Sequence, residues 1–396
     1  MRNSKHTLGR GALAAVVLGG IGAISSLGAT AALAGSPQPV GHVYVDDNAA
    51  GSNTVSVFSR SADGSLTPLA TSPFSIGGNG TGAGTGSQGA VQETPDEKYL
   101  LAVDPGSNQI SVLKIAADGA LRAVAGGPVS SGGIDPVSIA VDPIEGTVGD
   151  KDLVYVANAG TGGSNYTGFT LSGSGVLQPL RGTTVGLPNG SDPGDVLFNS
   201  NGTHLAGTRA GTALIDSFVV EANGHLKAAA GSPFTAQGPG PIGSEFRPTD
   251  PNQLFVSNAH GGTGNGTVSA FTVSSNGTLT SLKAGPFADD QTAPCWVEIS
   301  HDGRFLFAVN TATPSISRYA IASDGALRLI GSTPLATPSE SGPVDARLSP
   351  DGTTLSVVDS GGDSVSTFAV HGGNLTALGS PAPLPAGSSP VGIVVN

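Results

Sequence analysis

A Gly-x-Leu step recurs seven times along this chain, and its spacing limits the folds that the chain can adopt. Successive copies lie 48 to 56 residues apart, and a large apolar residue precedes each glycine by five or six positions. The seven glycines are Gly64, Gly119, Gly175, Gly224, Gly277, Gly325 and Gly373. A repeat of this length with a fixed internal register is typical of solenoids, propellers and other arrays, and it argues against one irregular core.

Each copy contains four strand-like segments separated by turn residues. The 396 residues include 61 glycines and 28 prolines, which interrupt short runs rich in Val, Ile, Thr and Phe. Asp-Gly or Asn-Gly stands between two such runs in five of the copies, and this signal predicts tight hairpins with type I′ turns. Four antiparallel strands joined by hairpins and repeated at this period form one blade of a β-propeller.

The two ends of the repeat region complement each other. The first copy begins at HVYVDDN and lacks the leading strand that follows a proline in later copies. The last segment, Pro390 followed by VGIVVN, is such a leading strand with nothing after it. We therefore expect the C-terminal strand to complete the first blade and leave no open sheet edge there. The prediction is an all-β, seven-bladed β-propeller over residues 42–396, with four antiparallel strands per blade.

The N-terminal residues have the pattern of a secretory signal. Arg2, Lys5 and Arg10 precede an apolar stretch, and Ala32-Leu33-Ala34 offers the small residues that signal peptidase recognises. We expect a signal peptide over 1–34, a short linker over 35–41 and a secreted mature protein; a retained membrane anchor is the alternative. The single cysteine, Cys295, is expected to be a small buried apolar residue.

Composition excludes several classes of partner and of chemistry. The formal net charge is −12, so no basic surface is expected for nucleic acid or an anionic membrane. The sequence lacks Gly-x-Ser-x-Gly, His-Glu-x-x-His, P-loop and Cys-x-x-Cys motifs. We expect a monomer without cofactor or resident metal. A calcium site at 46–48, at 150–152 or at 289–290 is an open alternative, although none has the spacing of a known calcium loop.

The leading strands supply the candidate functional site. Positions one, three and five after the opening proline are mostly apolar, whereas positions two and four are polar or small. Because side chains alternate along a strand, the second set is expected to face the central channel. The candidates for ligand contact there are Asp195, Trp296, Glu298, Asp345 and Arg347, with Glu245 as the candidate catalytic residue. The alternative is a water-filled axis lined by satisfied polar groups.

A second ring of polar residues stands at the end of the following strand. Its members are expected to bond their local backbone and shape the turn; they are Asp47, Asp104, Asn158, Asn258, Asn310 and Asp359. Arg209 holds this place in the fourth copy, and no turn requires an arginine, so we single it out for contact with an anionic group. An ion pair with an acid is the alternative. His260, on a glycine-rich loop, is a candidate ligand contact at a channel mouth, or else a solvent-exposed loop residue.

From about residue 42 to the C-terminus the chain resembles the lactonase-like β-propellers, which include 6-phosphogluconolactonases, carboxymuconate cyclases and YVTN-repeat surface proteins. The resemblance rests on SPDGTTLSVVDSGGDSVSTFAV, HDGRFLFAVNTATPSISRYAIASDGAL and VYVANAG. It implies a seven-bladed fold and, for the enzymes, a histidine and an arginine just after the opening proline of the middle copies. Those places hold Val137 and Ser138, and Ile242 and Gly243, which cannot relay a proton.

Two functions follow from these features. The missing histidines and the export signal favour a secreted scaffold that binds a small molecule or an extracellular protein through one mouth of its channel. The alternative is a lactone hydrolase in which Glu245 acts as general base and Arg209 holds an anionic substituent, with Arg247 as a further remnant of such a site.

Overall fold

The structure, a computed structural model, describes residues 39–336 and 342–396. The signal peptide expected over 1–34 lies outside these residues. Within them the chain forms 34 β-strands and seven antiparallel sheets. None of the described residues belongs to a helix with the length and apolar character needed to cross a membrane.

Each sheet is one blade, and its strands run outward from the axis in chain order, except that the C-terminal strand β34 is innermost in blade 1. Blades 1 to 3 contain β34 (Gly392–Val395) with β1 (Pro39–Asp46), β2 (Gly51–Ser61), β3 (Leu66–Pro68) and β4 (Phe74–Gly80); β5 (Val91–Glu93), β6 (Tyr99–Asp104), β7 (Gln109–Ile115), β8 (Leu121–Ala123) and β9 (Val129–Ser130); and β10 (Pro136–Val141), β11 (Asp152–Asn158), β12 (Asn165–Leu171), β13 (Leu177–Pro179) and β14 (Val185–Gly186).

The remaining four blades follow the same order. They contain β15 (Pro193–Phe198), β16 (His204–Arg209), β17 (Leu214–Val220), β18 (Leu226–Ala228) and β19 (Phe234–Thr235); β20 (Pro241–Arg247), β21 (Asp250–Asn258), β22 (Thr267–Val273), β23 (Leu279–Ser281) and β24 (Phe287–Ala288); β25 (Pro294–Ile299), β26 (Phe305–Asn310), β27 (Ser315–Ile321) and β28 (Leu327–Pro334); and β29 (Pro343–Leu348), β30 (Thr354–Asp359), β31 (Ser364–His371), β32 (Asn374–Ala377) and β33 (Ala382–Pro383).

The outermost strand is interrupted in six of the seven blades. Two short segments pair with different ends of the same third strand, as β3 and β4 do with β2. In blade 6 the single strand β28 spans the full length of β27. Each blade is therefore a four-stranded unit, as the repeat predicts.

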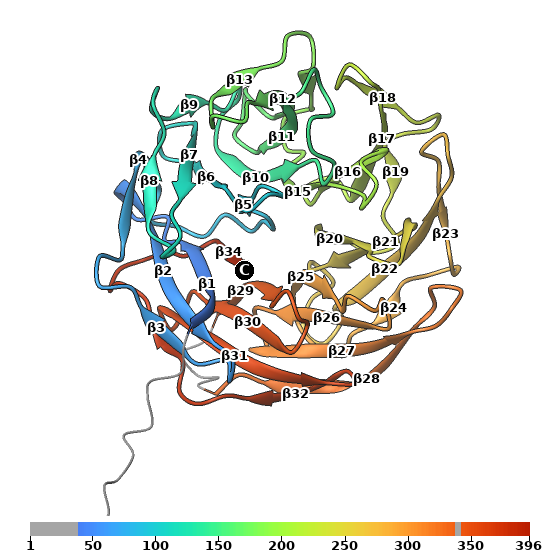
Figure 1. Cartoon of the computed structure of the whole chain (residues 1–396). Helices are drawn as coiled ribbons and strands as arrows, with labels where there is room; N and C mark the ends of the chain where they lie inside the picture. Colours follow the sequence, from blue (N-terminus) through green and yellow to red (C-terminus); the bar gives the residue numbers. More distant parts are fainter. Residues whose placement is uncertain (1–38, 337–341) are drawn as a thin grey trace, which may run out of the picture. The chain divides into compact units, whose positions relative to one another are not determined.

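The ring closes as the split first copy predicts. β34 pairs antiparallel with β1, with Val45 opposite Ile393 and Val43 opposite Val395. The leading strands of neighbouring blades contact one another all the way round, including β29 with β34 and β34 with β5. Figure 1 shows the seven sheets arranged around one axis, with the C-terminus near the middle. The seven-bladed β-propeller prediction is confirmed.

The core lies between the blades. Among the described residues the buried apolar side chains form seven clusters, and each cluster joins neighbouring blades. The large apolar residue that precedes each Gly-x-Leu step lies on the third strand and is almost fully buried in every copy: Phe58, Leu113, Phe169, Phe218, Phe271, Tyr319 and Phe368. The sequence repeat therefore marks one large, buried side chain on the third strand of each blade.

The turns at the five Asp-Gly and Asn-Gly steps differ from the type I′ prediction. Only the glycine has a positive φ there, as at Gly64 (82°), and Asp63 before it does not. In the last copy Gly372 (54°) and Gly373 (81°) both have positive φ, as a type I′ turn requires. The Gly64 N–H donates to Ser61, and the Ser61 N–H donates to Ser65, which is the pattern of a type I turn followed by a left-handed glycine. Asp63 accepts from the Ser65 N–H instead of adopting positive φ. The aspartate is selected for this side-chain bond and not for a left-handed backbone.

The first strand begins earlier than expected. β1 starts at Pro39, within the linker expected over 35–41, and Pro39 and Gly41 pair with Ser61 and Arg60 on β2. Cys295 is buried, as predicted.

Removing apolar contacts at the closing strand should weaken the whole ring. Ile393 is fully buried between blades 7 and 1. We expect Ile393→Ala to lower the free energy of unfolding by about 2–5 kcal/mol, the usual cost of such a cavity. Thr376→Ala, on the exposed face of the outer strand β32, is the control and should leave the midpoint of denaturant unfolding nearly unchanged. Equal midpoints for the two variants would contradict the closure described here.

Candidate functional site

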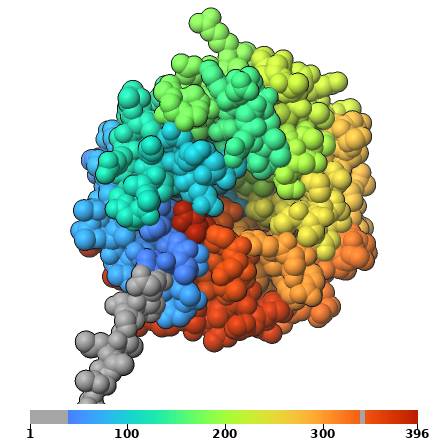
Figure 2. Space-filling model, in the orientation of Figure 1, coloured from blue at the N-terminus to red at the C-terminus, as the bar shows by residue number. Residues whose placement is uncertain are grey.

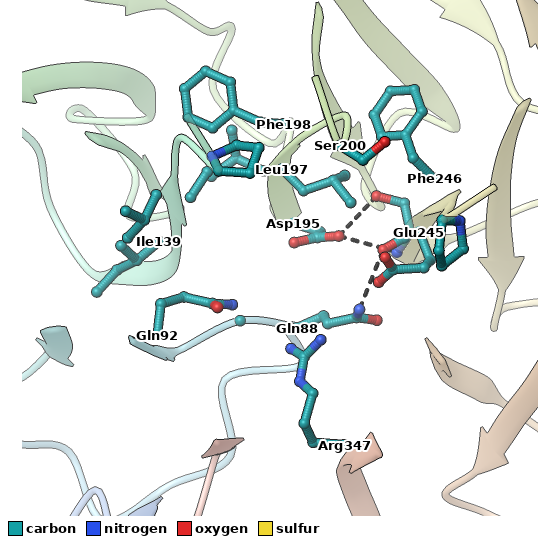
Figure 3. Close-up of a pocket in the computed structure, with 17 residues that line it drawn as sticks. Gln88, Gln92, Ile139, Asp195, Leu197, Phe198, Ser200, Glu245, Phe246 and Arg347 are labelled. Carbon is teal, nitrogen blue, oxygen red and sulfur yellow. Dashed lines mark hydrogen bonds between the residues drawn. The ribbon is translucent and has the colours of Figure 1, made fainter. Parts of the chain in front are cut away.

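A cavity of about 280 Å³ lies on the axis, lined by the leading strands of blades 2, 3, 4, 5 and 7. The space-filling view is hollowed near the centre of the ring (Figure 2). The charged and amide side chains in the lining are Gln88, Gln92, Asp195, Glu245 and Arg347, and Figure 3 shows them around one open space. Apolar residues complete the wall, among them Leu197 and Phe198.

A larger cavity, of about 540 Å³, lies between blades 1 and 7. Asp63 is its only ionisable lining residue. The axial cavity is smaller but gathers several ionisable groups from different blades, so it is the stronger candidate for chemistry.

Asp195 is held in the cavity wall by neighbouring blades. One carboxylate oxygen accepts the Ser138 hydroxyl of blade 3 at 3.1 Å. The other accepts the Ser244 hydroxyl at 2.7 Å and the Ser244 N–H at 3.0 Å, both from blade 5. Burial raises the Asp195 pKa to about 7, although these bonds act to lower it. This carboxyl therefore titrates near neutral pH.

Arg347 is the cation that faces this group of acids. Its Nη1 lies 3.2 Å from Glu298 Oε2, and the other oxygen of Glu298 accepts the Leu348 N–H at 2.9 Å. Burial acts to lower the Arg347 pKa, but the charges of Glu298 and then Asp345 raise it above its usual value. The guanidinium is thus permanently charged, and its side chain remains 24% exposed, toward the cavity.

Burial also disfavours the ionised forms of the remaining acids. Asp345 accepts the N–H groups of Ala346 and Ile393, and burial raises its pKa to about 7. Burial, and then the charge of Glu298, raises the pKa of Glu245 well above its usual value. Glu298 also has a raised pKa, because it too is buried. Four carboxyls surround one guanidinium, so near neutral pH several of them hold protons.

Gln88 closes one end of the cavity. Its side-chain amide donates to the carbonyls of Ser244 and Val297 and accepts the Val297 N–H, which joins blades 5 and 6. Its own N–H donates to the Gly194 carbonyl of blade 4. Gln88 stands where the other six leading strands open with a proline, and it was not among the predicted site residues. That replacement was the available signal, because proline has neither this N–H nor an amide side chain.

Trp296 helps to hold the segment that closes the cavity and does not line the cavity itself. It is buried, and its indole N–H donates to the carbonyl of Ser87. Gly243 lies against the same segment, since a Cβ at this position would come within 2.3 Å of Gln88 Oε1. The small residue at Gly243, which looked like a lost catalytic position, makes room for Gln88.

Arg209 lies outside the axial cavity, in an ion pair within blade 4. Its Nε and Nη2 both bind the carboxylate of Asp216, at 2.5 Å each, and the pair is almost fully buried. The Tyr166 hydroxyl of blade 3 donates to the same carboxylate at 3.0 Å. Both of these guanidinium contacts go to Asp216, so Arg209 stabilises the blade and does not face a ligand.

The partner of Arg209 follows the pattern of the second polar ring. Seven residues separate Arg209 from Asp216, and the same spacing joins Asp47 to Thr54, Asp104 to Ser111, Asn158 to Asn165 and Asn310 to Ser317. These side chains therefore join the second strand to the third, and most of them do not bond their local backbone as expected. Asp359 does so, by accepting the Gly362 N–H at 3.2 Å. Blade 4 uses a charged pair where most blades use a hydroxyl and an amide or acid.

Two other candidates, His260 and Arg247, also lie outside the cavity lining. His260 is exposed on the loop after β21 and is absent from the cavity lining. Arg247 is buried, and it donates to Gln253 and to the carbonyls of Gly303 and Ala322. No group of three or more His, Cys, Asp or Glu side chains in the described part of the chain is arranged to hold a metal ion.

Comparison with known proteins identifies relatives of the fold. The family "Lactonase, 7-bladed beta-propeller" matches residues 51–158 and 246–394. A proposed 6-phosphogluconolactonase of Bacteroides uniformis is similar in structure, with a TM-score of 0.69 and 19% identity over 91% of this chain and 100% of that one. No curated protein matches in sequence.

Two further solved structures have the same architecture. The periplasmic gluconolactonase of Pseudomonas aeruginosa has a TM-score of 0.70 and 18% identity over 90% of this chain and 98% of that one. A protein of Lactobacillus plantarum has a TM-score of 0.70 and 19% identity over 90% and 99% of the two chains. At such identities the likeness establishes the fold and leaves the chemistry to be argued from the cavity.

Breaking the Arg209–Asp216 pair should lower the stability of the protein without changing the lining of the axial cavity. Arg209→Met leaves a buried carboxylate unpaired, which typically costs about 3–5 kcal/mol. The double variant Arg209→Met with Asp216→Leu should recover much of this loss in urea unfolding. If Arg209→Met were as stable as the wild type, the guanidinium would not have the structural role assigned to it.

Asp195 should make stability depend on pH. In the folded protein it keeps its proton up to about pH 7, whereas the unfolded chain releases it near its ordinary pKa of 3.8. Its contribution is therefore present below about pH 4 and is lost as the pH rises through about 7.

We expect the free energy of unfolding of Asp195→Asn to fall less between pH 4 and 8 than that of the wild type, by about 2–4 kcal/mol. Asp324→Asn, at an exposed hairpin turn, serves as the control. Parallel stability curves for wild type and Asp195→Asn would show that this carboxyl titrates normally.

Proposed function

The chain belongs to the seven-bladed lactonase β-propeller family, and we propose that its axial cavity binds a small, uncharged, hydroxylated ring, with a sugar lactone as the class that the lining fits best. The observation that carries this proposal is the placement of Arg347, Gln92, Asp195 and Glu245 around one cavity on the axis.

The charge balance of the cavity favours a neutral ligand. Arg347 is paired with Glu298, while burial favours protonated Asp345, Asp195 and Glu245. The site thus offers many hydrogen-bond donors and acceptors with little net positive charge. A phosphorylated sugar carries about two negative charges, and Arg347, the one cation among the described lining residues, is already paired with Glu298. An unphosphorylated lactone has hydroxyl groups and a carbonyl that match the lining.

The size and walls of the cavity suit a single ring. Its volume of about 280 Å³ is just below the roughly 300–1,000 Å³ typical of small-molecule sites, as expected for a small ligand. Leu197 and Ala140 provide apolar surface beside the polar groups, as such sites usually do. The relatives named as gluconolactonases make a sugar lactone the natural class to test.

The sequence favoured a protein that binds either a small molecule or an extracellular protein, and this proposal takes the first of these. A protein partner has less support, because few large apolar side chains of the described residues are exposed: Val40, Ile134, Ile144 and Val176. Secretion is part of the proposal and rests on the pattern over residues 1–34 alone.

Lactone hydrolysis is a second candidate, favoured by the presence of both Asp195 and Arg347 in the lining of one cavity. A carboxyl that titrates near pH 7 is suited to take a proton from water. The water oxygen would then bond to the lactone carbonyl carbon, while Arg347 stabilises the developing oxyanion. The ring C–O bond would break, and the ring oxygen would take a proton to give a hydroxy acid.

These roles differ from those expected from the sequence. Burial raises the pKa of Glu245 well above its usual value, which favours the protonated form, so Glu245 suits the acid that protonates the leaving oxygen better than the base. Arg347, and not Arg209, is the arginine of the cavity lining, and its role here is to stabilise the oxyanion, whereas the sequence hypothesis had Arg209 hold an anionic substituent.

Ligand binding tests the first proposal directly. The probe is gluconolactam, a ring that resembles gluconolactone but resists hydrolysis, titrated calorimetrically into the protein. Loss of a hydrogen bond to a charged group costs about 1.5–3 kcal/mol. Arg347→Gln should therefore weaken binding by roughly 10- to 100-fold. Arg304→Gln, which removes an exposed arginine on another hairpin, is the matched control. The proposal fails if gluconolactam does not bind the wild type.

Turnover separates binding from catalysis. If the second function holds, gluconolactone opens faster than its spontaneous rate, with kcat rising as the pH passes through about 7, the pKa of Asp195. Asp195→Asn should lower kcat by at least about 100-fold and change affinity little, because general bases contribute about 10²–10⁴-fold. If the protein binds the lactam but does not turn over the lactone, the hydrolase proposal is rejected and the binding proposal stands.

A further inference from the structure

We infer that ligand reaches the axial cavity through one mouth only, at the ends of the leading strands, and that Gln88 is the floor that sets how long a ligand can be. This inference deepens the proposed function, because it names the route to that site and the residue that limits ligand size.

The floor is tied to the ring on several sides. The Gly89 carbonyl accepts the Ile139 N–H of blade 3, and the Gln88 N–H donates to Gly194 of blade 4. The Gln88 amide bonds blades 5 and 6, and Trp296 of blade 6 holds Ser87. One short segment from blade 2 therefore spans the axis and bonds to four other blades. Its residues Ser87, Gln88 and Gly89 are all buried.

The opposite end of the cavity meets solvent. Three lining residues lie in the hairpins that follow β10, β15 and β20, and all three are exposed: Pro143, Ser200 and Pro248. The lining thus changes from buried at Gln88 to exposed at this rim. A cavity of this form is a blind pocket and not a channel open at both ends.

The floor limits the length of the ligand as well as its route. Every polar atom of the Gln88 side chain is already bonded to the protein, so Gln88 offers a wall and not a recognition group. A single ring fits between this wall and the rim, whereas a linked second ring has to project from the rim toward solvent.

Access to the cavity can be measured with a thiol reporter, independently of any ligand. Cys295 is the only cysteine, so Cys295→Ala gives a thiol-free background. Ala140→Cys then places one thiol in the cavity wall. The rate of its reaction with N-ethylmaleimide is compared among rim and floor variants, after thermal melting has shown that each is folded.

Ser200→Trp should cover the rim and slow the reaction by at least about tenfold, since thiol reactivity depends on access. Asn201→Trp, on the same hairpin but outside the lining, is the matched control and should react like the parent. Adding Gln88→Gly to Ser200→Trp should restore the rate, because it opens the floor.

An unchanged rate in Ser200→Trp would overturn the single-mouth inference, as would a failure of Gln88→Gly to restore access in a folded protein. Neither result depends on gluconolactam binding. Conversely, normal reporter behaviour without lactam binding would reject the proposed function and leave the route intact.

Discussion

Closure of the ring by β34 is the constraint on which the rest of the structure depends. No leading strand can bury its side chains alone; each packs against the strands of the next blade, and the last of these contacts needs a strand from the far end of the chain. Closure fixes the positions of seven leading strands around an axis, so side chains from residues as distant as Gln92, Asp195 and Arg347 share one cavity. The site is therefore a property of the ring and not of any single blade.

The electrostatics of the axis come from burial more than from charge pairing. One guanidinium cannot neutralise four carboxyls, and removing them from water disfavours their ionised forms. Protonation of some carboxyls removes negative charge that no cation balances, so several acids and one arginine can lie in a small volume. The same balance makes the cavity rich in hydrogen bonds yet poor in net charge, and it gives Asp195 a pKa suited to proton transfer.

The sequence predicts the fold well because the same strand and turn pattern occurs in seven copies. The incomplete first copy predicts that the C-terminal strand closes the ring. Alternation along the leading strands also places Asp195, Glu245, Glu298, Asp345 and Arg347 near the axis. Interactions between blades are harder to predict, because they depend on residues far apart in the chain. Arg209 looks unpaired until Asp216 is seen across the strand, and Gly243 looks like a lost catalytic residue until Gln88 is seen against it. The turn type was wrong because an aspartate side chain can cap a turn without positive φ.

The most direct measurement is a crystal structure of the protein with gluconolactam. We predict the ring on the axis, between Asp195 and Arg347 and above Gln88, with its hydroxyl groups bonded to the carboxyls. Lactam bound instead in the cavity between blades 1 and 7, or an axis that holds only water at saturating lactam, would contradict the account.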